Sequence, residues 1–513
     1  MAFISLTKLA VALIALFLAR RAYWEATTGA RRRALKKQHG CLPPKHIPTK
    51  DPILGLDRFF KNLKAYKEHR QLEAWGQELT DNNAHTIMLS ILRQTIFVTD
   101  DPSNVKTMLA TEFDDWSIGS ERISSMTSFL GKGIFTTEGA AWKHSREMLR
   151  PCFERSQVAD VSIMEKHTAR LIDLVPKDGA TIDLAPLFHN LTLDVSTEFL
   201  FGQSTNSLDP GQEKSCDEFV EAFEYCQDPF KENISWFSIL SQFLPDPRFK
   251  RCIKVIQEFI DGIIESEIAS RTSKPDSATN RYVFLDELLS QTSDLTRIRS
   301  ELLNILLAGR DTTASLLSNI FFELPRHPSI VSRLRREIAE HVGRDPPTYQ
   351  QLKEMKYLKA IINESQRLYP IVPTNSRQAV KDTLLPHGGG PDATAPLFVP
   401  KGAVVAWLSR AMHRREDIYG PDAEAFNPSR WLDGEHASSP LRPGWGYLPF
   451  NGGPRICIGQ QFALTETSYV VVRLLQEFPV LESRDDEPWR EKLSITVTGL
   501  GGAKVGLRDF GEG

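Results

Sequence analysis

Closely spaced cysteines are absent from this chain. Its 513 residues include six cysteines, and no two of them stand in a CxxC arrangement. Structural disulfides are therefore not expected, and a reducing, cytosol-facing environment fits the composition. The six are Cys41, Cys152, Cys216, Cys226, Cys252 and Cys457.

Signatures of several other protein classes are also missing. The sequence has no HExxH motif, no serine nucleophile elbow and no dinucleotide fingerprint. The glycine-rich residues 388–392 lack the downstream Lys-Ser/Thr pair and helix of a phosphate loop, so we expect a β-hairpin turn there. A formal net charge of -3 and a pI of about 6.5 give no basis for nucleic-acid binding.

No linker of the kind that separates domains is found either. Length alone would predict about three domains, but without a linker we expect one large domain over residues 51–513. Residues 1–20 are predicted to form an N-terminal membrane anchor. Residues 21–50 are predicted to form a basic, proline-rich hinge.

The anchor prediction rests on residues 2–19, which are largely apolar and as a helix would span roughly 27 Å. Basic residues follow, with Glu25 as the single acid among them, which places the side after the helix in the cytoplasm. A cleaved signal peptide is the alternative, but its basic residues would come before the apolar run. We expect a retained anchor that Pro43, Pro44 and Pro48 bring to an end.

The rest of the chain has a mainly helical pattern with short β-strands. Residues 156–286 are expected to be helices and loops, and residues 493–502 a hairpin that touches substrate. Residue 101 is the expected N-cap of a short helix. The other helices are predicted over residues 59–79, 101–112 and 294–324, and strands over 87–91 and 94–99.

Residues 450–459, Phe-Asn-Gly-Gly-Pro-Arg-Ile-Cys-Ile-Gly, are predicted to be a loop that presents Cys457 and then starts a helix. All three glycines tolerate backbone angles that side chains forbid, so the main chain can lie close to a flat cofactor. The free N–H groups of the following helix would stabilise Cys457 as a thiolate. Arg455 is placed to meet a carboxylate, and Phe450 to keep water from the sulfur.

Phe, Gly, Arg, Cys and Gly at this spacing resemble the haem-binding signature of the cytochrome P450 family, and the resemblance extends from about residue 51 to the end of the chain. It implies the cytochrome P450 fold: mainly α with small β-sheets, a single large domain and an N-terminal membrane helix. It also implies haem (iron protoporphyrin IX) with Cys457 as the axial ligand. Such a thiolate favours cleavage of the O–O bond.

Residues 306–313 contain glycine and two threonines, which are poor helix-interior residues, so a local bulge is predicted there. By resemblance to the family's oxygen-activating motif, Ala308 and Gly309 leave room for dioxygen. Thr312 would hold dioxygen by a hydrogen bond, and Asp311 would relay protons from solvent. The alternative is that Asp311 only caps or solvates a kinked helix.

Other side chains are assigned by the same resemblance. Trp142 and Arg146, four residues apart on one helical face, would hold one haem propionate, and Arg377 the other. Glu364, Arg367 and Arg430 would form a buried charge cluster that locks the cysteine loop and takes no part in the chemistry.

Within the family the chain looks most like fungal membrane-bound alkane and fatty-acid hydroxylases. The stretches that carry this likeness are residues 50–57, 131–135, 308–314 and 388–392. It implies hydroxylation by O2 at or near the end of an alkyl chain, in a protein of the endoplasmic reticulum membrane whose catalytic domain faces the cytoplasm. The chain is too short for a fused flavin reductase, so the separate membrane-bound NADPH–cytochrome P450 reductase is the expected electron donor.

Three alternatives remain open from the sequence. One is oxidative tailoring of a polyketide or terpenoid in fungal secondary metabolism. The second is a haem-thiolate isomerase or dehydratase, which could dispense with the pair Asp311 and Thr312. The third is a non-enzymatic haem sensor or electron carrier.

Overall fold

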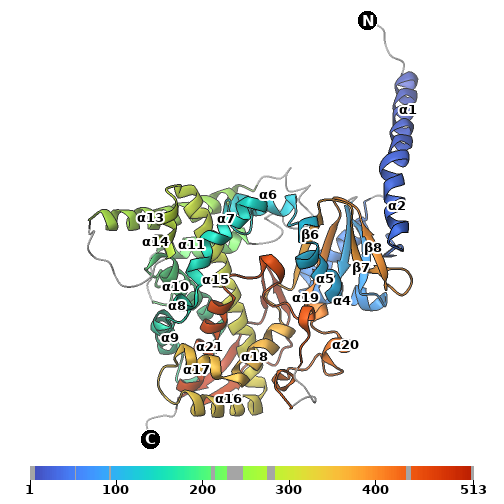
Figure 1. The fold of residues 1–513 in the computed structure, drawn as a ribbon. Helices are drawn as coiled ribbons and strands as arrows, with labels where there is room; N and C mark the ends of the chain where they lie inside the picture. The colour runs from blue at the N-terminus through green and yellow to red at the C-terminus, as the bar shows by residue number, and fades with distance from the viewer. Residues whose placement is uncertain are drawn as a thin grey trace.

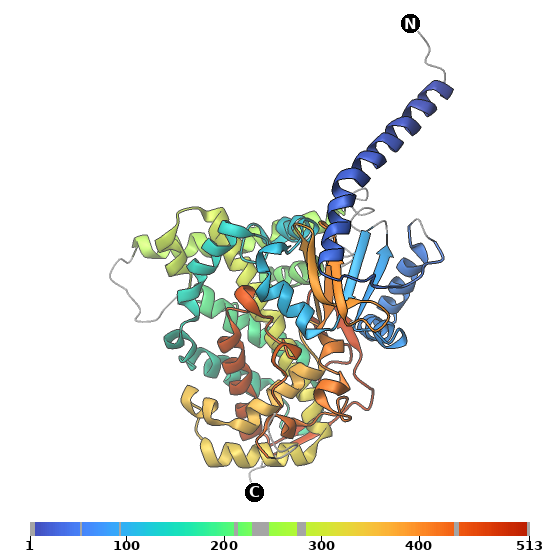
Figure 2. The same cartoon turned by 45° about the vertical axis from the view of Figure 1, so that its right-hand side comes forward.

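The computed structural model describes residues 6–51, 54–91, 94–209, 214–227, 246–273, 284–434 and 441–509. Helices make up one side of the molecule and a β-rich part the other, and a long N-terminal helix projects away from both (Figures 1 and 2). This arrangement confirms the predicted mainly helical fold with small sheets.

The projecting helix has three sections. Helix α1 (Leu6–Trp24) passes through a π-helical turn (Glu25–Gly29) into α2 (Ala30–Gln38). The prediction that prolines end this helix is wrong: it ends before them, where Gly40 takes a left-handed φ of 65° and the N–H of Cys41 bonds to Lys36 O at 2.8 Å. Among the described residues, no helix combines the length and apolar character that crossing a membrane requires.

Helix α2 is held against the β-hairpin of β7 (Thr383–Gly389) and β8 (Ala395–Val399). The Arg32 guanidinium donates two hydrogen bonds to Asp382, at 3.0 and 2.7 Å. Lys36 Nζ lies 4.8 Å from the centre of the Phe398 ring. A bidentate pair and a cation–π contact together fix the direction in which the N-terminal helix leaves the body.

The largest sheet has six strands in the order β1-β2-β3-β9-β6-β4. Its strands β2 (Thr86–Ile91) and β3 (Gln94–Thr99) confirm both predicted strands. The remaining strands of this sheet are β1 (Lys45–His46), β4 (Trp116–Ser117), β6 (Thr374–Ala379) and β9 (Val404–Leu408).

The helix predicted over residues 59–79 is wrong as a single element. It is divided into α3 (Leu56–Lys67) and α4 (Gln71–Asp81), because His69 between them has a left-handed φ of 55° that an α-helix cannot include. The predicted short helix from residue 101 is confirmed as α5 (Pro102–Lys106), which continues as the π-helical turn Thr107–Thr111. The Asp101 carboxylate caps it by accepting the N–H groups of Ser103 and Asn104.

The helical side is organised around α15 (Leu295–Glu323), where most residues are buried. Asp294 caps its first turn, in agreement with the predicted bounds. Helices α10 (Leu184–Phe201), α18 (Lys356–Leu368) and α21 (Gln460–Glu477) pack against it. The other helices are α6 (Ser120–Leu130), α7 (Gly139–Leu149), α8 (Arg155–Val158), α9 (Ser162–Leu174), α11 (Lys214–Cys226), α13 (Pro247–Ser273), α14 (Phe284–Gln291), α16 (Pro328–His341), α17 (Tyr349–Glu354), α19 (Ser409–Met412) and α20 (Glu416–Tyr419).

Three small sheets complete the fold. The glycine-rich residues 388–392 lie in the β7–β8 hairpin as predicted, and β11 (Glu491–Leu493) pairs with β12 (Val497–Gly499) as the predicted C-terminal hairpin. Strand β5 (Asp178–Asp183) lies in a region predicted to be helical and pairs with the distant β13 (Lys504–Arg508), which also pairs with β10 (Val480–Ser483).

Candidate active site

One cavity of about 630 Å³ has walls from both the cysteine loop and the middle of α15. Cys457 and Phe450 contribute from the loop, and Ala308, Gly309 and Thr312 contribute from the helix. The C-terminal hairpin reaches the same cavity through residues 493–496. The fold thus brings together the two motifs that the sequence analysis had singled out separately.

The cysteine loop is tight, and Cys457 N–H donates to Phe450 O at 3.0 Å. Of the three glycines that were expected to allow unusual backbone angles, one uses this freedom. Gly453 has a φ of 68°, whereas Gly452 and Gly459 have φ values of -154° and -86°, which other residues adopt. A Cβ atom at Gly453 would also lie 1.8 Å from Leu109 O, so this one position requires glycine for two reasons.

We expect Gly453→Ala to prevent the cysteine loop from forming. The new methyl group would overlap the Leu109 carbonyl and strain the left-handed backbone, so the variant should lose several kcal/mol of stability and most of its haem. Gly459→Ala is the matched control, because its Cβ would meet Phe153 at an ordinary 3.5 Å. Haem content per protein and the urea midpoint of unfolding measure both effects; equal losses in the two variants would contradict the argument.

The Cys457 side chain is accessible from the cavity, although protein surrounds the loop. Burial raises the pKa of the thiol, and the Gly459 N–H at the start of α21 and the charge of Arg146 only partly offset it. The helix therefore stabilises the thiolate as expected, but in the protein without a bound metal the effect of burial is larger. A metal cation bound at the sulfur would reverse the balance.

Four arginines line the same cavity, and each bonds to a neutral oxygen where a carboxylate would be the usual partner. Burial lowers the pKa of Arg377 to about 9 and of Arg455 to about 10, and the neighbouring arginines contribute to both shifts. The four bonds are Arg122 to Asn375 Oδ1 (2.8 Å), Arg146 to Ile456 O (3.0 Å), Arg377 to Ser376 O (2.7 Å) and Arg455 to Thr137 O (3.0 Å).

Trp142 lies between two of these cations. Its ring centre is 4.4 Å from the Arg455 guanidinium carbon and 5.9 Å from that of Arg146. Cations that are partly withdrawn from water and bonded to no carboxylate are costly unless an anion joins them. The cavity is largely apolar and combines an accessible sulfur with four arginines. These features fit a planar group that carries two carboxylates and a metal.

Arg122 was not among the predicted site residues. It stands near the start of α6 with no neighbouring motif, and only the fold brings it to Asn375 on β6. Burial lowers the pKa of Arg122 as it does for the other three arginines. The sequence carried no signal that would have found it.

The bulge predicted in α15 is absent, since the helix is continuous from Leu295 to Glu323. The Thr312 hydroxyl donates to Ala308 O at 2.5 Å, so it bonds within the helix without distorting it. Gly309 lines the cavity, but a Cβ there would lie 2.7 Å from Ser196 Oγ of α10. Its lack of a side chain thus permits close packing of α10 on α15, in addition to any effect on the cavity.

Asp311 lies behind the cavity wall, with 7% of its side chain exposed. Burial opposes its ionisation, but Arg310, His189 and Gln227 outweigh it and hold the pKa of Asp311 below its usual value. Arg310 Nη1 is 2.9 Å and His189 Nδ1 is 3.5 Å from Asp311 Oδ1. The helix is therefore not interrupted at Asp311, and other side chains rather than solvent surround its carboxylate.

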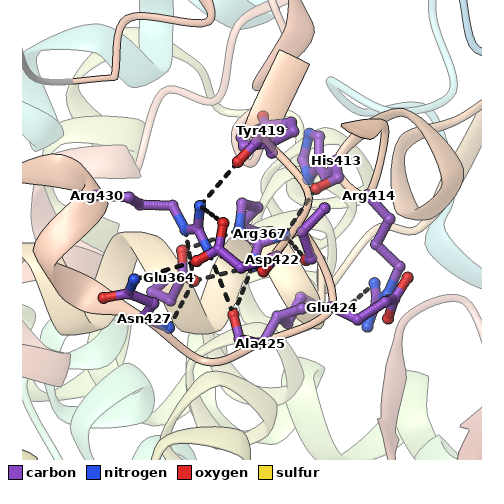
Figure 3. A network of polar contacts seen from close by, with 12 residues as sticks. Glu364, Arg367, His413, Arg414, Tyr419, Asp422, Glu424, Ala425, Asn427 and Arg430 are labelled. Atoms are coloured by element: carbon purple, nitrogen blue, oxygen red, sulfur yellow. Dashed lines mark hydrogen bonds and ion pairs between the residues drawn. The ribbon is translucent and has the colours of Figure 1, made fainter. Parts of the chain in front are cut away.

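The predicted charge cluster is confirmed (Figure 3). Glu364 and Arg367 have no exposed side-chain surface, and their two hydrogen bonds measure 2.8 and 2.9 Å. Arg430 Nε joins them at 2.9 Å from Glu364 Oε1, and Trp431 Nε1 donates to the other oxygen at 2.9 Å. Arg367 also donates to the His413 carbonyl.

This cluster is connected to the segment that precedes Cys457. Burial lowers the pKa of His413 to about 3, so the ring is neutral and its Nε2 accepts the N–H of Leu448 at 3.0 Å. The Tyr447 hydroxyl donates to Asn363 O at 3.0 Å, next to Glu364 on α18. The cluster thus holds α18 and the approach to the cysteine loop together.

Glu466 of α21 is fully buried, with the Thr313 hydroxyl of α15 beside it. Burial raises the pKa of Glu466 to about 8. A glutamate in the unfolded chain has a pKa of about 4.3, so between these two pKa values the folded protein binds more protons than the unfolded chain. The stability of the folded protein therefore falls as the pH rises through this range.

We therefore expect Glu466→Gln to remove much of this pH dependence. The variant should gain on the order of a few kcal/mol relative to the parent protein at pH 8.5, with little change at pH 4.5. Urea unfolding at both pH values measures the difference. The same difference in stability at both pH values would mean that folding does not raise the pKa of Glu466.

Comparisons with known proteins agree with this geometry. A family model described as Cytochrome P450 matches residues 57–501. Cytochrome P450 monooxygenase himC of Aspergillus japonicus is 41% identical, over 95% of this chain and 87% of its own. Cytochrome P450 52E1 of Candida apicola is 42% identical over 90% of this chain and 92% of its own, and cytochrome P450 52A1 of Candida tropicalis is 44% identical over 83% and 80%.

The fold and the site together define a haem-thiolate oxidoreductase. The chain belongs to the cytochrome P450 family of monooxygenases.

Proposed function

We propose that this protein hydroxylates an unactivated C–H bond at or near the end of a long alkyl chain, as in an alkane or a fatty acid. The observation that carries the proposal is the shared wall of one largely apolar cavity, to which the Cys457 loop and the middle of α15 both contribute. An alkyl chain would gain about 0.8 kcal/mol for each methylene buried there. The sequence likeness to fungal membrane-bound alkane and fatty-acid hydroxylases adds support.

In this proposal Cys457 Sγ would hold the haem through its iron, and Phe450 would keep water from the sulfur. Trp142, Arg146, Arg377 and Arg455 bind the propionates, and Gly309 borders the oxygen side. The haem supplies reductive activation of dioxygen when bound. One oxygen atom enters the C–H bond, and the other leaves as water with two protons and two electrons.

The protons come through the helix that faces the cysteine. The Thr312 hydroxyl turns from Ala308 O toward dioxygen and donates a hydrogen bond from Oγ1. Asp311 delivers protons to it from behind the cavity wall. Because its pKa is lowered, the Asp311 carboxyl is ionised near neutral pH. It must therefore take up a new proton before each delivery.

The N-terminal helix is proposed to anchor the protein in the endoplasmic reticulum membrane, with the catalytic domain toward the cytoplasm. Large apolar side chains of α1 are exposed, and Leu16 and Phe17 have 65% and 67% of their surface open. Membrane-bound NADPH–cytochrome P450 reductase would supply the electrons.

Turnover of lauric or palmitic acid with NADPH and the reductase tests the proposed substrate class. We expect a hydroxy acid with the new hydroxyl at or near the terminal carbon, in amounts that match oxygen uptake. Oxygen uptake with a polyketide or terpenoid panel, but not with the fatty acids, would favour oxidative tailoring instead. No oxygen uptake with any substrate would favour a haem sensor.

A further inference from the structure

Asp311 is enclosed by polar groups from three helices. Arg310 precedes it on α15, His189 reaches it from α10, and Gln227 reaches it from the residue after α11. Glu224 of α11 lies one step further out, with its Oε1 3.0 Å from Arg310 Nη2. Protons that Asp311 delivers must enter through one of these neighbours or through water between them.

These neighbours differ in their ability to pass a proton. An arginine keeps its proton at any physiological pH, so the exposed Glu224 carboxylate cannot supply Asp311 through Arg310. The Gln227 amide has no titratable proton near neutral pH. An imidazole both accepts and releases a proton between about pH 5 and pH 8. Among the described neighbours of Asp311, His189 is therefore the one that has the required chemistry.

The position of His189 also suits transfer. Its Nδ1 atom is buried, has no hydrogen-bond partner within the described part of the chain and lies 3.5 Å from Asp311 Oδ1. The side chain as a whole is 24% exposed, so solvent reaches part of it. One edge of the imidazole faces the carboxylate while another part faces water.

We propose that His189 passes protons from solvent to Asp311. A hydronium ion in the solvent gives a proton to Nε2 as the Nδ1 proton moves to Asp311 Oδ1, and Asp311 then passes its proton toward Thr312. The imidazole ends neutral in the other tautomer, and turning of the side chain into solvent lets water take the Nε2 proton and return one to Nδ1. His189 acts through Asp311, and this inference rests on the proposed oxygen-activating function.

The test uses the full chain with haem, reductase and NADPH, and compares His189→Gln with the parent protein. Glutamine keeps a polar side chain but cannot titrate, so product formed per NADPH should fall by about tenfold, with water carrying the remaining protons. Hydrogen peroxide should account for the lost product, and the solvent deuterium isotope effect on product formation should rise. Product formation driven by added hydrogen peroxide, which needs no proton supply from NADPH turnover, should change little.

His327→Gln is the matched control. His327 also lies beside a carboxylate of α15, with its Nε2 3.0 Å from Glu323 Oε2, and is 37% exposed. This variant should keep the parent yield per NADPH. Equal yields in the parent and His189→Gln, or equal losses in both variants, would overturn the inference. A parent protein that consumes NADPH without any hydroxylated product would instead contradict the proposed function.

Discussion

Cys457→Ala is expected to lose the red-shifted absorption band of the ferrous–CO complex. Alanine removes the sulfur that the cysteine loop presents to the cavity, and no other cysteine lines this cavity among the described residues. Product formation should fall by more than the roughly 10- to 100-fold that loss of an outer-shell partner costs a metal site. The CO difference spectrum and hydroxy-acid yield measure both effects.

The matched control for this variant is Cys41→Ala. Cys41 is a half-buried thiol in the N-terminal region, and its substitution should leave the band and the yield unchanged. A red-shifted band that survives in Cys457→Ala would show that another group binds the iron. The assignment of the whole cavity would then be wrong.

Glu364→Gln is expected to have the largest effect on stability. The glutamine keeps the shape of the side chain but leaves Arg367 and Arg430 as buried cations without their shared anion. Breaking a buried charge cluster in this way costs about 3–5 kcal/mol. We expect a corresponding fall in the urea midpoint, and a protein that is purified largely without haem.

Glu424→Gln provides the comparison within the same region (Figure 3). Glu424 pairs with Arg414 at 3.0 Å but is 75% exposed, so its loss should cost less than about 1 kcal/mol. Similar losses in the two variants would mean that burial of the cluster is not what makes it important.

The features that the sequence predicted best are those carried by local pattern. Asp294 and Asp101 stand where N-caps are preferred, and the helices after them begin within one residue of the predictions. Glu364 and Arg367 are one helical turn apart, so their pairing follows from spacing. Their contact with Arg430, far along the chain, came from the family resemblance and had no local signal.

Features that depend on close approach between distant segments could not be predicted in this way. The need for glycine at Gly453 comes from Leu109 O, and the need at Gly309 comes partly from Ser196. Arg122 and His189 reach the site only because α6 and α10 pack beside it. The break at His69 has neither glycine nor proline to mark it.

The docking of α2 on the β7–β8 hairpin determines where the chain can be shortened. Arg32 and Lys36 cover Asp382 and Phe398, whereas the residues before Ala30 belong to the part that projects from the body. A chain that starts at Ala30 retains this covering helix and the carboxylate's partner. A chain that starts after Gly40 leaves the Asp382 carboxylate and the Phe398 ring uncovered. A start at Ala30 is therefore the better choice for producing an enzyme that crystallises.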